Sequence, residues 1–546
     1  MKKKKILAIF VALAMLFTLA LTASAEGGPG GEPPSGSPPG GSPPGGAPGG
    51  SSSSSVSYSG TTSITSSDSQ SDKTYSSSTA DENSLLIDTS DSVTISNPTV
   101  TKSGDSDGGD NCNFYGINSG IMVKGGGTTT ITGGTVETTA TGANGVFSYG
   151  GNGGQNGADG DGTTVIIKDT VINTTGDNAG GIMTTGGGIT QAENLTITTS
   201  GRSSAAIRTD RGGGTVTVTG GSYTTSGLGS PAIYSTADIT VNDASLVSNL
   251  SEGVCIEGKN SVTINNSTLT ANNTQMNGNA TFLDSIMIYQ SMSGDADSGT
   301  SSFTMSGGTL TSKSGHVFHV TNTNAIINLS GVTINNEDSA NVLLSVCDDG
   351  WSGSSNIATL NADGQVLNGT ILVGDNSTLT LNLTNSSAFT GTVSGEITNA
   401  KGTTVSTEVG TVSVTLDDTS KWSLTADTYI TEFNGNAANV INNGYTLYVN
   451  GTALEGTSDS GEMPTASAVS SGSTDTAVTN TADTTETANT AKTASTQSNN
   501  NTVVYIIIGA AVVIIAAAAI VIVIKRKSSE IEAVNTQTDN SDNNEN

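Results

Sequence analysis

Aromatic and charged side chains are both scarce in this chain of 546 residues. Aromatic residues make up 4% of it, charged residues 12% and hydrophobic residues 33%. One thick globular core needs more large apolar side chains than this. A solenoid needs fewer, because a narrow column of Ile, Val, Leu and Ala fills it while Thr, Ser, Asn and Gly cover the outside. Disorder is the rival interpretation, but recurring β-branched runs disfavour it in the middle of the chain.

Basic residues are scarcer than acidic ones, at 19 against 48, and the formal net charge is −29. Such a surface repels nucleic acid and anionic lipid, so we expect no nucleic-acid partner. Cationic partners, divalent metals and neutral glycans stay open. Cysteine is rarer still, and the wide spacing of Cys112, Cys255 and Cys347 predicts isolated buried thiols, not a disulfide framework.

Both ends of the chain carry targeting and linker signals. Residues 1–25 combine a basic start, an apolar run and a small-residue cleavage site, which predicts a signal peptide. Residues 26–80 and 456–502 are rich in Gly, Pro, Ser and Thr, and we expect two disordered stalks. Residues 503–524 are uncharged and precede a basic cluster, which predicts one transmembrane helix with a cytoplasmic tail at 525–546. The expected location is therefore the cell membrane, with the large N-terminal region outside.

The middle of the chain repeats itself. Short β-type runs recur behind one apolar anchor per repeat, at a period of about 28 residues, and no segment shows sustained helical periodicity. This pattern predicts an all-β fold: a right-handed parallel β-helix solenoid of about ten or eleven coils over residues 81–376. Residues 377–455 are expected to be terminal coils with a cap, or a small β module. The proposed anchors are Ile87, Ile121, Val146, Ile182, Ile207, Ile233, Ile256, Ile288, Phe318, Leu344 and Ile371.

The repeats carry motifs such as GGTVETTATG (133–142), GGSYTTSG (220–227) and GGTLTSKSG (307–315). With the signal peptide, stalks and anchor, they resemble the adhesin-like surface proteins of Gram-positive bacteria and some archaea, which have a pectin-lyase-like right-handed β-helix. The resemblance implies attachment to a host, a neighbouring cell or a polysaccharide, and we expect a module that binds a surface glycan or protein without catalysis. The same fold also houses polysaccharide lyases and glycoside hydrolases, so an extracellular enzyme of either kind is the alternative.

One coil concentrates basic residues in this acidic chain. Arg202, Arg208 and Arg211 lie beside Asp210, and the four are candidate contacts for an anionic ligand, with solvated surface charge as the alternative. A lyase would also need a cation to neutralise the substrate carboxylate, and a hydrolase would need paired carboxylates. The sequence shows neither arrangement, so no catalytic residue is assigned.

Acidic loops are candidate calcium sites. Gly-rich turns place oxygen ligands at alternating positions, as calcium accepts, although each loop supplies only two or three carboxylates. Solvated acidic turns are the alternative. Long steps between anchors also predict insertions at 150–162, 274–285 and 291–302, where binding surfaces usually lie. The candidate ligands are Asp105, Asp107, Asp110, Asp159, Asp161, Asp295 and Asp297.

Two further patterns carry weaker hypotheses. His316 and His319 are three residues apart, so in a strand they should point to opposite faces and at most one could line a site. Thr-x-Thr pairs, at 128–130, 215–217, 217–219 and 268–270, are typical of flat threonine arrays that order water and bind ice. An ice-binding face needs strict register over many coils, whereas these pairs drift relative to the anchors. We therefore expect threonine here only because it suits exposed strand positions.

Overall fold

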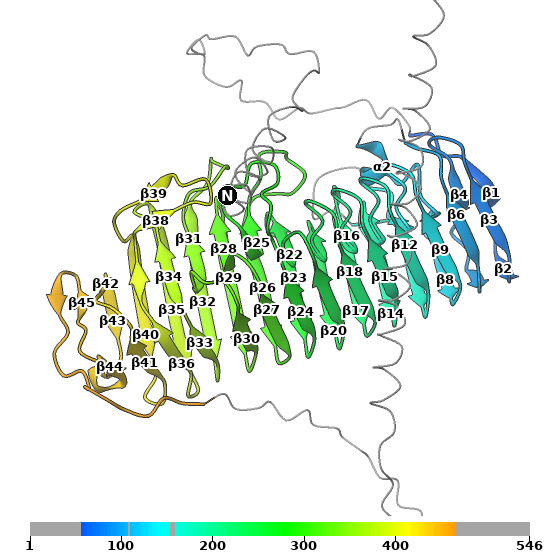
Figure 1. Ribbon diagram of the computed structural model, residues 1–546. Coiled ribbons are helices and arrows are strands. Elements are labelled where there is room, and N and C mark those ends of the chain that lie inside the picture. Colours follow the sequence, from blue (N-terminus) through cyan, green and yellow to red (C-terminus); the bar gives the residue numbers. More distant parts are fainter. Residues whose placement is uncertain (1–55, 107–109, 153–158, 466–546) are drawn as a thin grey trace, which may run out of the picture. The chain divides into compact units, whose positions relative to one another are not determined.

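The computed structural model describes residues 56–106, 110–152 and 159–465. There the chain enters three parallel sheets in turn, one strand in each, before it returns to the first (Figure 1). This is the parallel β-helix architecture that the repeat period predicts. The predicted signal peptide, the membrane span, the cytoplasmic tail and most of both stalks lie outside the described residues. Among the helices that are described, none has the length and apolarity to cross a bilayer.

Sheet A has thirteen strands. They are β1 (Gly60–Ile64), β4 (Asn83–Asp88), β7 (Ile121–Lys124), β10 (Val146–Tyr149), β13 (Ile182–Thr185), β16 (Ile207–Thr209), β19 (Ile233–Ser235), β22 (Val254–Glu257), β25 (Asp284–Tyr289), β28 (His316–Thr321), β31 (Val342–Val346), β34 (Thr370–Val373) and β37 (Val393–Ser394).

Sheet B has fourteen strands. They are β2 (Asp68–Ser71), β5 (Val93–Ser96), β8 (Thr128–Thr132), β11 (Thr164–Lys168), β14 (Gly188–Glu193), β17 (Gly214–Thr219), β20 (Asp238–Asn242), β23 (Ser261–Asn265), β26 (Thr300–Ser306), β29 (Asn324–Ser330), β32 (Asn356–Asp363), β35 (Ser377–Thr384), β40 (Thr411–Leu416) and β43 (Glu432–Asn434).

Sheet C has ten strands. They are β3 (Thr74–Ser77), β6 (Thr99–Lys102), β9 (Thr135–Thr138), β12 (Val171–Thr174), β15 (Thr196–Thr199), β18 (Ser222–Thr225), β21 (Ser245–Ser248), β24 (Thr268–Ala271), β27 (Thr309–Ser312) and β30 (Thr333–Asn336). The smaller sheets contain β33 (Val366–Asn368), β36 (Ala388–Gly391), β38 (Ile397–Thr398), β39 (Thr404–Ser406), β41 (Lys421–Leu424), β42 (Thr428–Ile430), β44 (Val440–Ile441), β45 (Leu447–Val449) and β46 (Thr452–Ala453).

The coils begin before the predicted repeat region, and they continue after it into residues 377–455, where terminal coils were one of the two alternatives. β1 begins at Gly60, inside the segment expected to be linker, because its Thr-rich run pairs in parallel with β4. At the other end, β35 pairs with β40, and β40 with β43, so sheet B continues through residues 377–434. The stack therefore has more coils than the ten or eleven expected.

The strand register corrects three of the proposed anchors. Ile121, Val146, Ile182, Ile207 and Ile233 follow one another as direct partners in sheet A. The column then continues through Val254 and Ile286 to Phe318, so Ile256 and Ile288 belong to the neighbouring inward column, as does Ile87. Residues two apart in a strand face the same side, so a hydrophobic pattern does not separate the two columns.

The corner between sheets B and C has the same tight turn in successive coils. Two residues connect β5 to β6, β8 to β9 and β17 to β18, and the first of them has positive φ: Asn97 at 47°, Gly133 at 68° and Gly220 at 68°. Glycine and asparagine adopt this conformation at low cost. A Cβ on Gly133 would lie 2.4 Å from Asn97 Oδ1 of the preceding coil, so the close stacking of the turns also favours glycine.

One continuous column of buried side chains, mostly Ile, Val and Leu, fills the stack, and an aromatic residue is buried near each end. Tyr75 is 3% exposed in the N-terminal coil, and its hydroxyl donates to Gln70 Oε1 at 2.6 Å. Near the C-terminal end Trp422 is fully buried, stacks on Phe389 and donates from Nε1 to Gly391 O at 3.0 Å. The three cysteines are buried, and none forms a disulfide within the described residues, as the sequence predicts.

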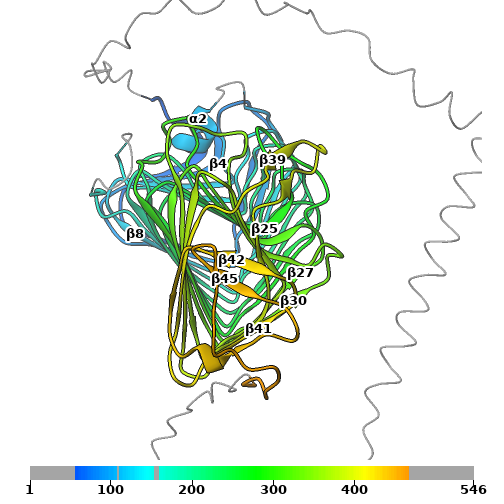
Figure 2. The same ribbon diagram turned by 90° about the vertical axis from the view of Figure 1, so that its left-hand side faces the viewer.

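Insertions leave the coils from both ends of the sheet A strands. They include the segment with helix α2 (Asn111–Phe114) and the segment with β38 and β39, which lie on the same side of the stack (Figures 1 and 2). A short 3-10 helix, Ala437–Asn439, lies near the C-terminal end. The insertions cover outward side chains of sheet A, so that Met122, Phe147 and Met183 are fully buried on its outer side.

Candidate binding grooves

Arg208 is held inside the protein by several partners. It points outward from β16, and its Nη2 lies 2.9 Å from Asp210 Oδ2. Its Nη1 donates to Ser203 O at 3.0 Å and to Asn113 Oδ1 of helix α2 at 3.3 Å. The Arg208 side chain is only 12% exposed. Burial raises the pKa of Asp210 to about 6, although Arg208 acts in the opposite direction.

The other two arginines also contact insertions. Arg211 Nη2 lies 2.6 Å from Asp295 Oδ1, and its guanidinium lies 4.1 Å from the ring centre of Phe114. Arg202 Nη2 donates to Asn277 Oδ1 at 3.2 Å. Segments 111–114, 274–285 and 291–302 therefore meet at this one coil. The sequence predicted the arginines as ligand contacts, and the structure gives each of them a partner within the chain.

A small pocket lies between these insertions and sheet A. It measures about 230 Å³, and Arg208, Tyr234, Asn277 and Tyr289 contribute to its lining. Both tyrosine hydroxyls donate to the carboxylate of Glu257, at 2.6 and 3.0 Å. Burial raises the pKa of both tyrosines well above the usual value, so their hydroxyls stay protonated. The pocket thus offers aromatic rings and an amide to a small polar group.

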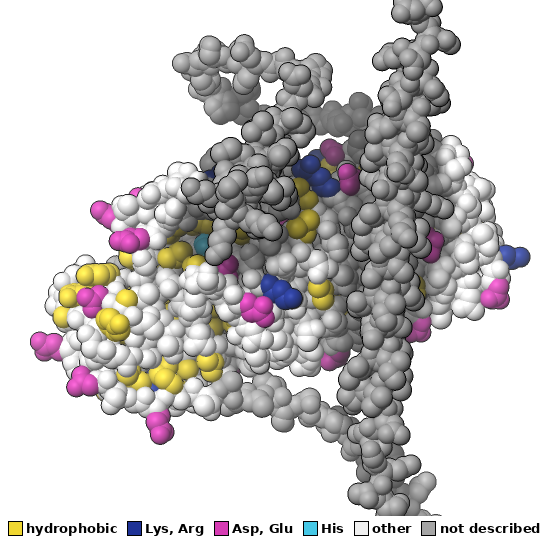
Figure 3. Space-filling view, viewed as in Figure 1, with side chains coloured by type: hydrophobic (Ala, Val, Ile, Leu, Met, Phe, Trp, Pro, Cys, Tyr) yellow, Lys and Arg dark blue, Asp and Glu magenta, His cyan; other side chains and the backbone are white. Residues whose placement is uncertain are grey.

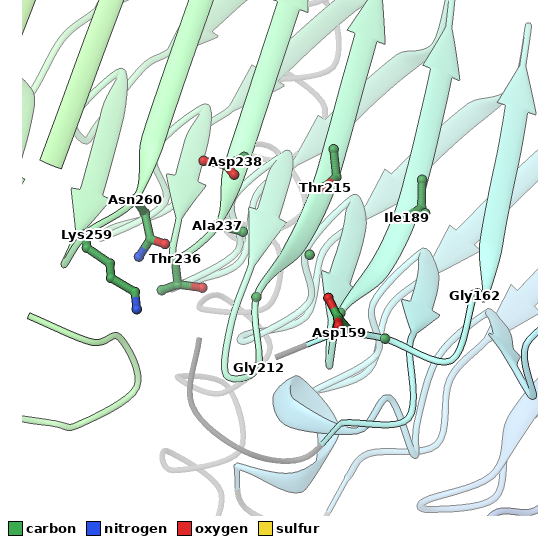
Figure 4. A pocket seen from close by; sticks show the side chains of 14 residues that line it. Asp159, Gly162, Ile189, Gly212, Thr215, Thr236, Ala237, Asp238, Lys259 and Asn260 are labelled. Atoms are coloured by element: carbon green, nitrogen blue, oxygen red, sulfur yellow. The ribbon is translucent and has the colours of Figure 1, made fainter. Parts of the chain in front are cut away.

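A larger groove follows the corner between sheets A and B (Figure 4). Its volume is about 490 Å³, and turns from several successive coils form it. In Figure 4, Asp238, Lys259 and Asn260 line one side, while Asp159 lies across from them. Much of the remaining wall is backbone, because glycines at 160, 162, 187 and 212–214 carry no side chain that would fill the groove. The groove is therefore open at these turns, and hydroxyl and amide side chains lie along it.

Two further hollows continue along the same corner, with volumes of about 390 and 260 Å³. Gln290 lines both, and serine and asparagine side chains make up much of the lining. Gln290 Nε2 donates to Ala296 O at 3.2 Å, but its Oε1 is buried and has no hydrogen-bond partner among the described residues. Buried acceptors are normally satisfied, so this oxygen is an exception within the wall of the two hollows.

The groove and the two hollows carry few charged side chains, namely Asp159, Asp238 and Lys259 in the groove and Asp297 in one hollow. Lys259 Nζ lies 2.9 Å from Asp297 Oδ2, which connects the larger groove to the next hollow. The face seen in Figure 3 shows acidic side chains scattered singly instead of gathered into one patch. A neutral ligand with many hydroxyls meets more complementary groups here than a strongly charged one does.

The candidate calcium ligands do not come together in the part of the chain that is described. Asp107 lies outside the described residues, and Asp110 is exposed before α2. Asp105 Oδ1 accepts from Thr141 N, while Asp161 Oδ1 accepts from Thr163 N and Oγ1. Asp159 lines the groove, and Asp295 and Asp297 pair with Arg211 and Lys259. Within the described ranges no cluster of three or more His, Cys, Asp or Glu is arranged to hold a metal ion. Calcium binding stays a prediction.

The two histidines point to the same side of sheet A, which corrects the sequence prediction. His316 Nδ1 and His319 Nδ1 each lie 2.7 Å from Ser345 Oγ. Val317 and Phe318 are both buried in the core, because the chain turns from sheet C into sheet A at this point and two consecutive residues face inward. The flanking histidines therefore both face outward, beneath the Phe282 ring.

This histidine cluster resembles a hydrolase triad in residue types only. His319 Nε2 lies 3.3 Å from Asp349 Oδ2, so serine, histidine and aspartate do lie in a chain. Ser345, His319 and the Asp349 side chain are all 0% exposed. Asp349 Oδ1 also accepts from Thr281 N and Oγ1, which ties the insertion at 274–285 to this loop. The cluster therefore holds loops together, and no signal in the sequence brings its members into one group.

Comparisons with protein-family models, with curated proteins and with solved structures found no match for this chain.

Proposed function

We propose that this chain is a membrane-anchored cell-surface protein that binds a neutral glycan in the groove between sheets A and B, without catalysis. The observation that carries the proposal is the groove itself. With the two hollows it follows successive coils, and it presents hydroxyl and amide groups with few charges. A linear polymer of hydroxyl-rich units matches such a lining better than a compact ligand does. The membrane anchor rests on the apolar segment 503–524 alone.

The alternative is an extracellular polysaccharide lyase or glycoside hydrolase, and it has less support. A lyase base must be free to take a proton from its substrate. Arg208 and Arg211 both donate to carboxylates within the chain. The pair Asp348 and Asp349 is not available either: Asp348 accepts from Asn356 at 2.6 Å, and the Asp349 side chain is buried.

A blocked groove tests the proposal. Thr215 is exposed at the start of β17 and lines the groove, whereas Thr219 is exposed at the end of the same strand and does not. Thr215→Trp should fill the groove and weaken binding of the full-length protein, in detergent, to a panel of neutral oligosaccharides by at least about tenfold, which corresponds to about 1.4 kcal/mol. Thr219→Trp is the matched control and should bind like the unmodified protein.

Two results would overturn the proposal. The first is the absence of binding to any glycan on the panel. The second is an equal loss of affinity in both tryptophan variants, because the groove would then not be the site. Release of unsaturated products or reducing ends from uronate polymers would instead favour the enzyme.

A further inference from the structure

The outer face of sheet C is a regular array of threonine. Each of its ten strands, from β3 to β30, presents two outward positions, so the face has twenty. Threonine occupies twelve of them, seven in one column and five in the other. The first column is Thr74, Thr99, Thr135, Val171, Thr196, Ser222, Ser245, Thr268, Thr309 and Thr333; the second is Ser76, Thr101, Glu137, Asn173, Thr198, Thr224, Val247, Thr270, Thr311 and Asn335.

The register of this array is strict, which overturns the objection raised from the sequence. Every pairing in sheet C is parallel, and none contains a register shift from β3 to β30. Of the pairs identified in the sequence, only the one at 268–270 lies on sheet C, whereas those at 128–130, 215–217 and 217–219 lie on sheet B. The pairs therefore differ in their positions relative to the anchors, which lie in sheet A, where insertions of different length separate the strands. The connection from sheet B to sheet C has two residues in each of these coils, so the threonines keep their places.

The face is open and almost uncharged. The insertions leave from the ends of sheet A, and in Figure 2 β27 and β30 form a different wall of the stack from the side that carries α2 and β39. None of the twelve threonines is buried. Glu137 is the single charged residue among the twenty positions, in a chain with 48 acidic residues. A charged partner would find almost no complementary group here.

The side chains also repeat in two dimensions. Neighbouring coils are about 4.8 Å apart, and positions i and i+2 within a strand are about 6.7 Å apart. Threonine is β-branched and stiff at χ1, so its methyl and hydroxyl groups are held in place at little entropic cost. Some hydroxyls are further oriented by their neighbours in the next coil, as where Thr101 Oγ1 donates to Ser76 Oγ at 2.9 Å.

A rigid neutral lattice is suited to a partner that is itself a neutral lattice, because many weak contacts then form together. We propose that the outer face of sheet C binds ice. Hexagonal ice repeats its oxygen positions at closely similar separations along two perpendicular axes, and it offers both donors and acceptors to the threonine hydroxyls. Crystalline polysaccharide is the less suitable solid, since its sugar faces stack on aromatic rings and the twenty outward positions contain none.

The test compares two double variants of the full-length protein in detergent. Thr196→Lys with Thr268→Lys places long charged side chains on sheet C, at two exposed positions. Thr132→Lys with Thr219→Lys makes the same change at exposed positions of sheet B. We expect the unmodified protein to show thermal hysteresis and to enter slowly grown ice. In the sheet C variant, thermal hysteresis and incorporation into ice should both fall about tenfold, whereas the sheet B variant should keep both.

A second sheet C variant guards against misfolding. Thr196→Tyr with Thr268→Tyr keeps residues that favour strands but lifts the face away from a flat solid, so the same loss is expected with an unchanged circular dichroism spectrum. Exclusion of the unmodified protein from ice, or an equal loss in the sheet B variant, would overturn the proposal. Retention on crystalline cellulose or chitin without entry into ice would also overturn it and would indicate that the face binds a solid polysaccharide.

Discussion

Replacing Arg211 by alanine should loosen two insertions and leave the stack intact. The guanidinium connects Asp295, in the insertion after β25, to the Phe114 ring at the end of α2. Both ion-pair partners are partly exposed, at 34% and 22% of their side chains. Solvent therefore screens the pair, and its contribution is about 0.5–1 kcal/mol. The cation over the ring adds about 0.5–1 kcal/mol.

The expected loss is about 1–2 kcal/mol of local stability, which raises the population of the open insertions by about 5- to 30-fold. Native-state hydrogen exchange measures this directly, because opening free energies differ between parts of a structure. Tyr115 N, which donates to Asn111 O at 3.0 Å, reports on α2, and Asp295 N, which donates to Ser293 Oγ at 3.2 Å, reports on the other insertion. Amides of the sheet strands should keep their protection.

Lys168→Ala is the matched control. Lys168 Nζ also lies 2.6 Å from a carboxylate, that of Glu193, but both side chains are nearly half exposed on sheet B. No change in exchange is expected there. Unchanged protection of both insertions in the Arg211 variant, or faster exchange through all coils, would refute the reasoning.

Three further changes probe the core, the outer face and a buried acid. Phe303 is fully buried against Phe318, so Phe303→Ala should lower the unfolding free energy, measured with denaturant, by about 3–5 kcal/mol. Thr304 faces outward, so Thr304→Ala should lower it far less, and equal losses would contradict the packing. Asn361→Ala removes hydrogen bonds of 2.9 Å to Asn328 and Asn382 in neighbouring coils of sheet B, and it should lower the unfolding free energy by about 1–2 kcal/mol. An unchanged unfolding free energy would contradict this and would mean that water replaces both partners. Burial raises the pKa of Asp210 from 3.8 to about 6, so the folded state favours the neutral acid. Relative to the Asp210→Asn variant, the protein should therefore lose about 3 kcal/mol of unfolding free energy as the pH rises from 4 through 6. A difference between the two proteins that does not change with pH would contradict this.

The sequence predicts the architecture well because its signals are local. A Gly, Asn or Asp recurs where sheet B turns into sheet C, and the structure gives such residues positive φ, as at Asn97, Gly133 and Gly220. The alternation of Val and Ile with Thr marks which side faces inward. The position of the anchors within a strand is harder to predict from the sequence. Ile256 and Val254 both face the core, and only their pairing with the neighbouring coils distinguishes them.

The candidate site depends on contacts between distant residues. Arg211 and Asp295 are 84 positions apart, and Arg208 and Asn113 are 95 apart. Nothing in the local pattern shows that an arginine in a coil will meet an insertion from another coil. The groove is equally hard to predict from the sequence, because it forms where glycines in several successive turns have no side chain to fill the space. Of the Thr-x-Thr pairs identified in the sequence, only Thr268 and Thr270 belong to the sheet C array, and recognising the array requires the constant two-residue turn before sheet C.

The most direct test of the proposed function is a hydrogen-exchange footprint of the full-length protein with a bound neutral oligosaccharide. A ligand in the groove should protect backbone amides at 187 and 212–214 and should leave those of sheet C unchanged. Protection confined to other parts of the chain, or no protection at saturating oligosaccharide, would contradict the account.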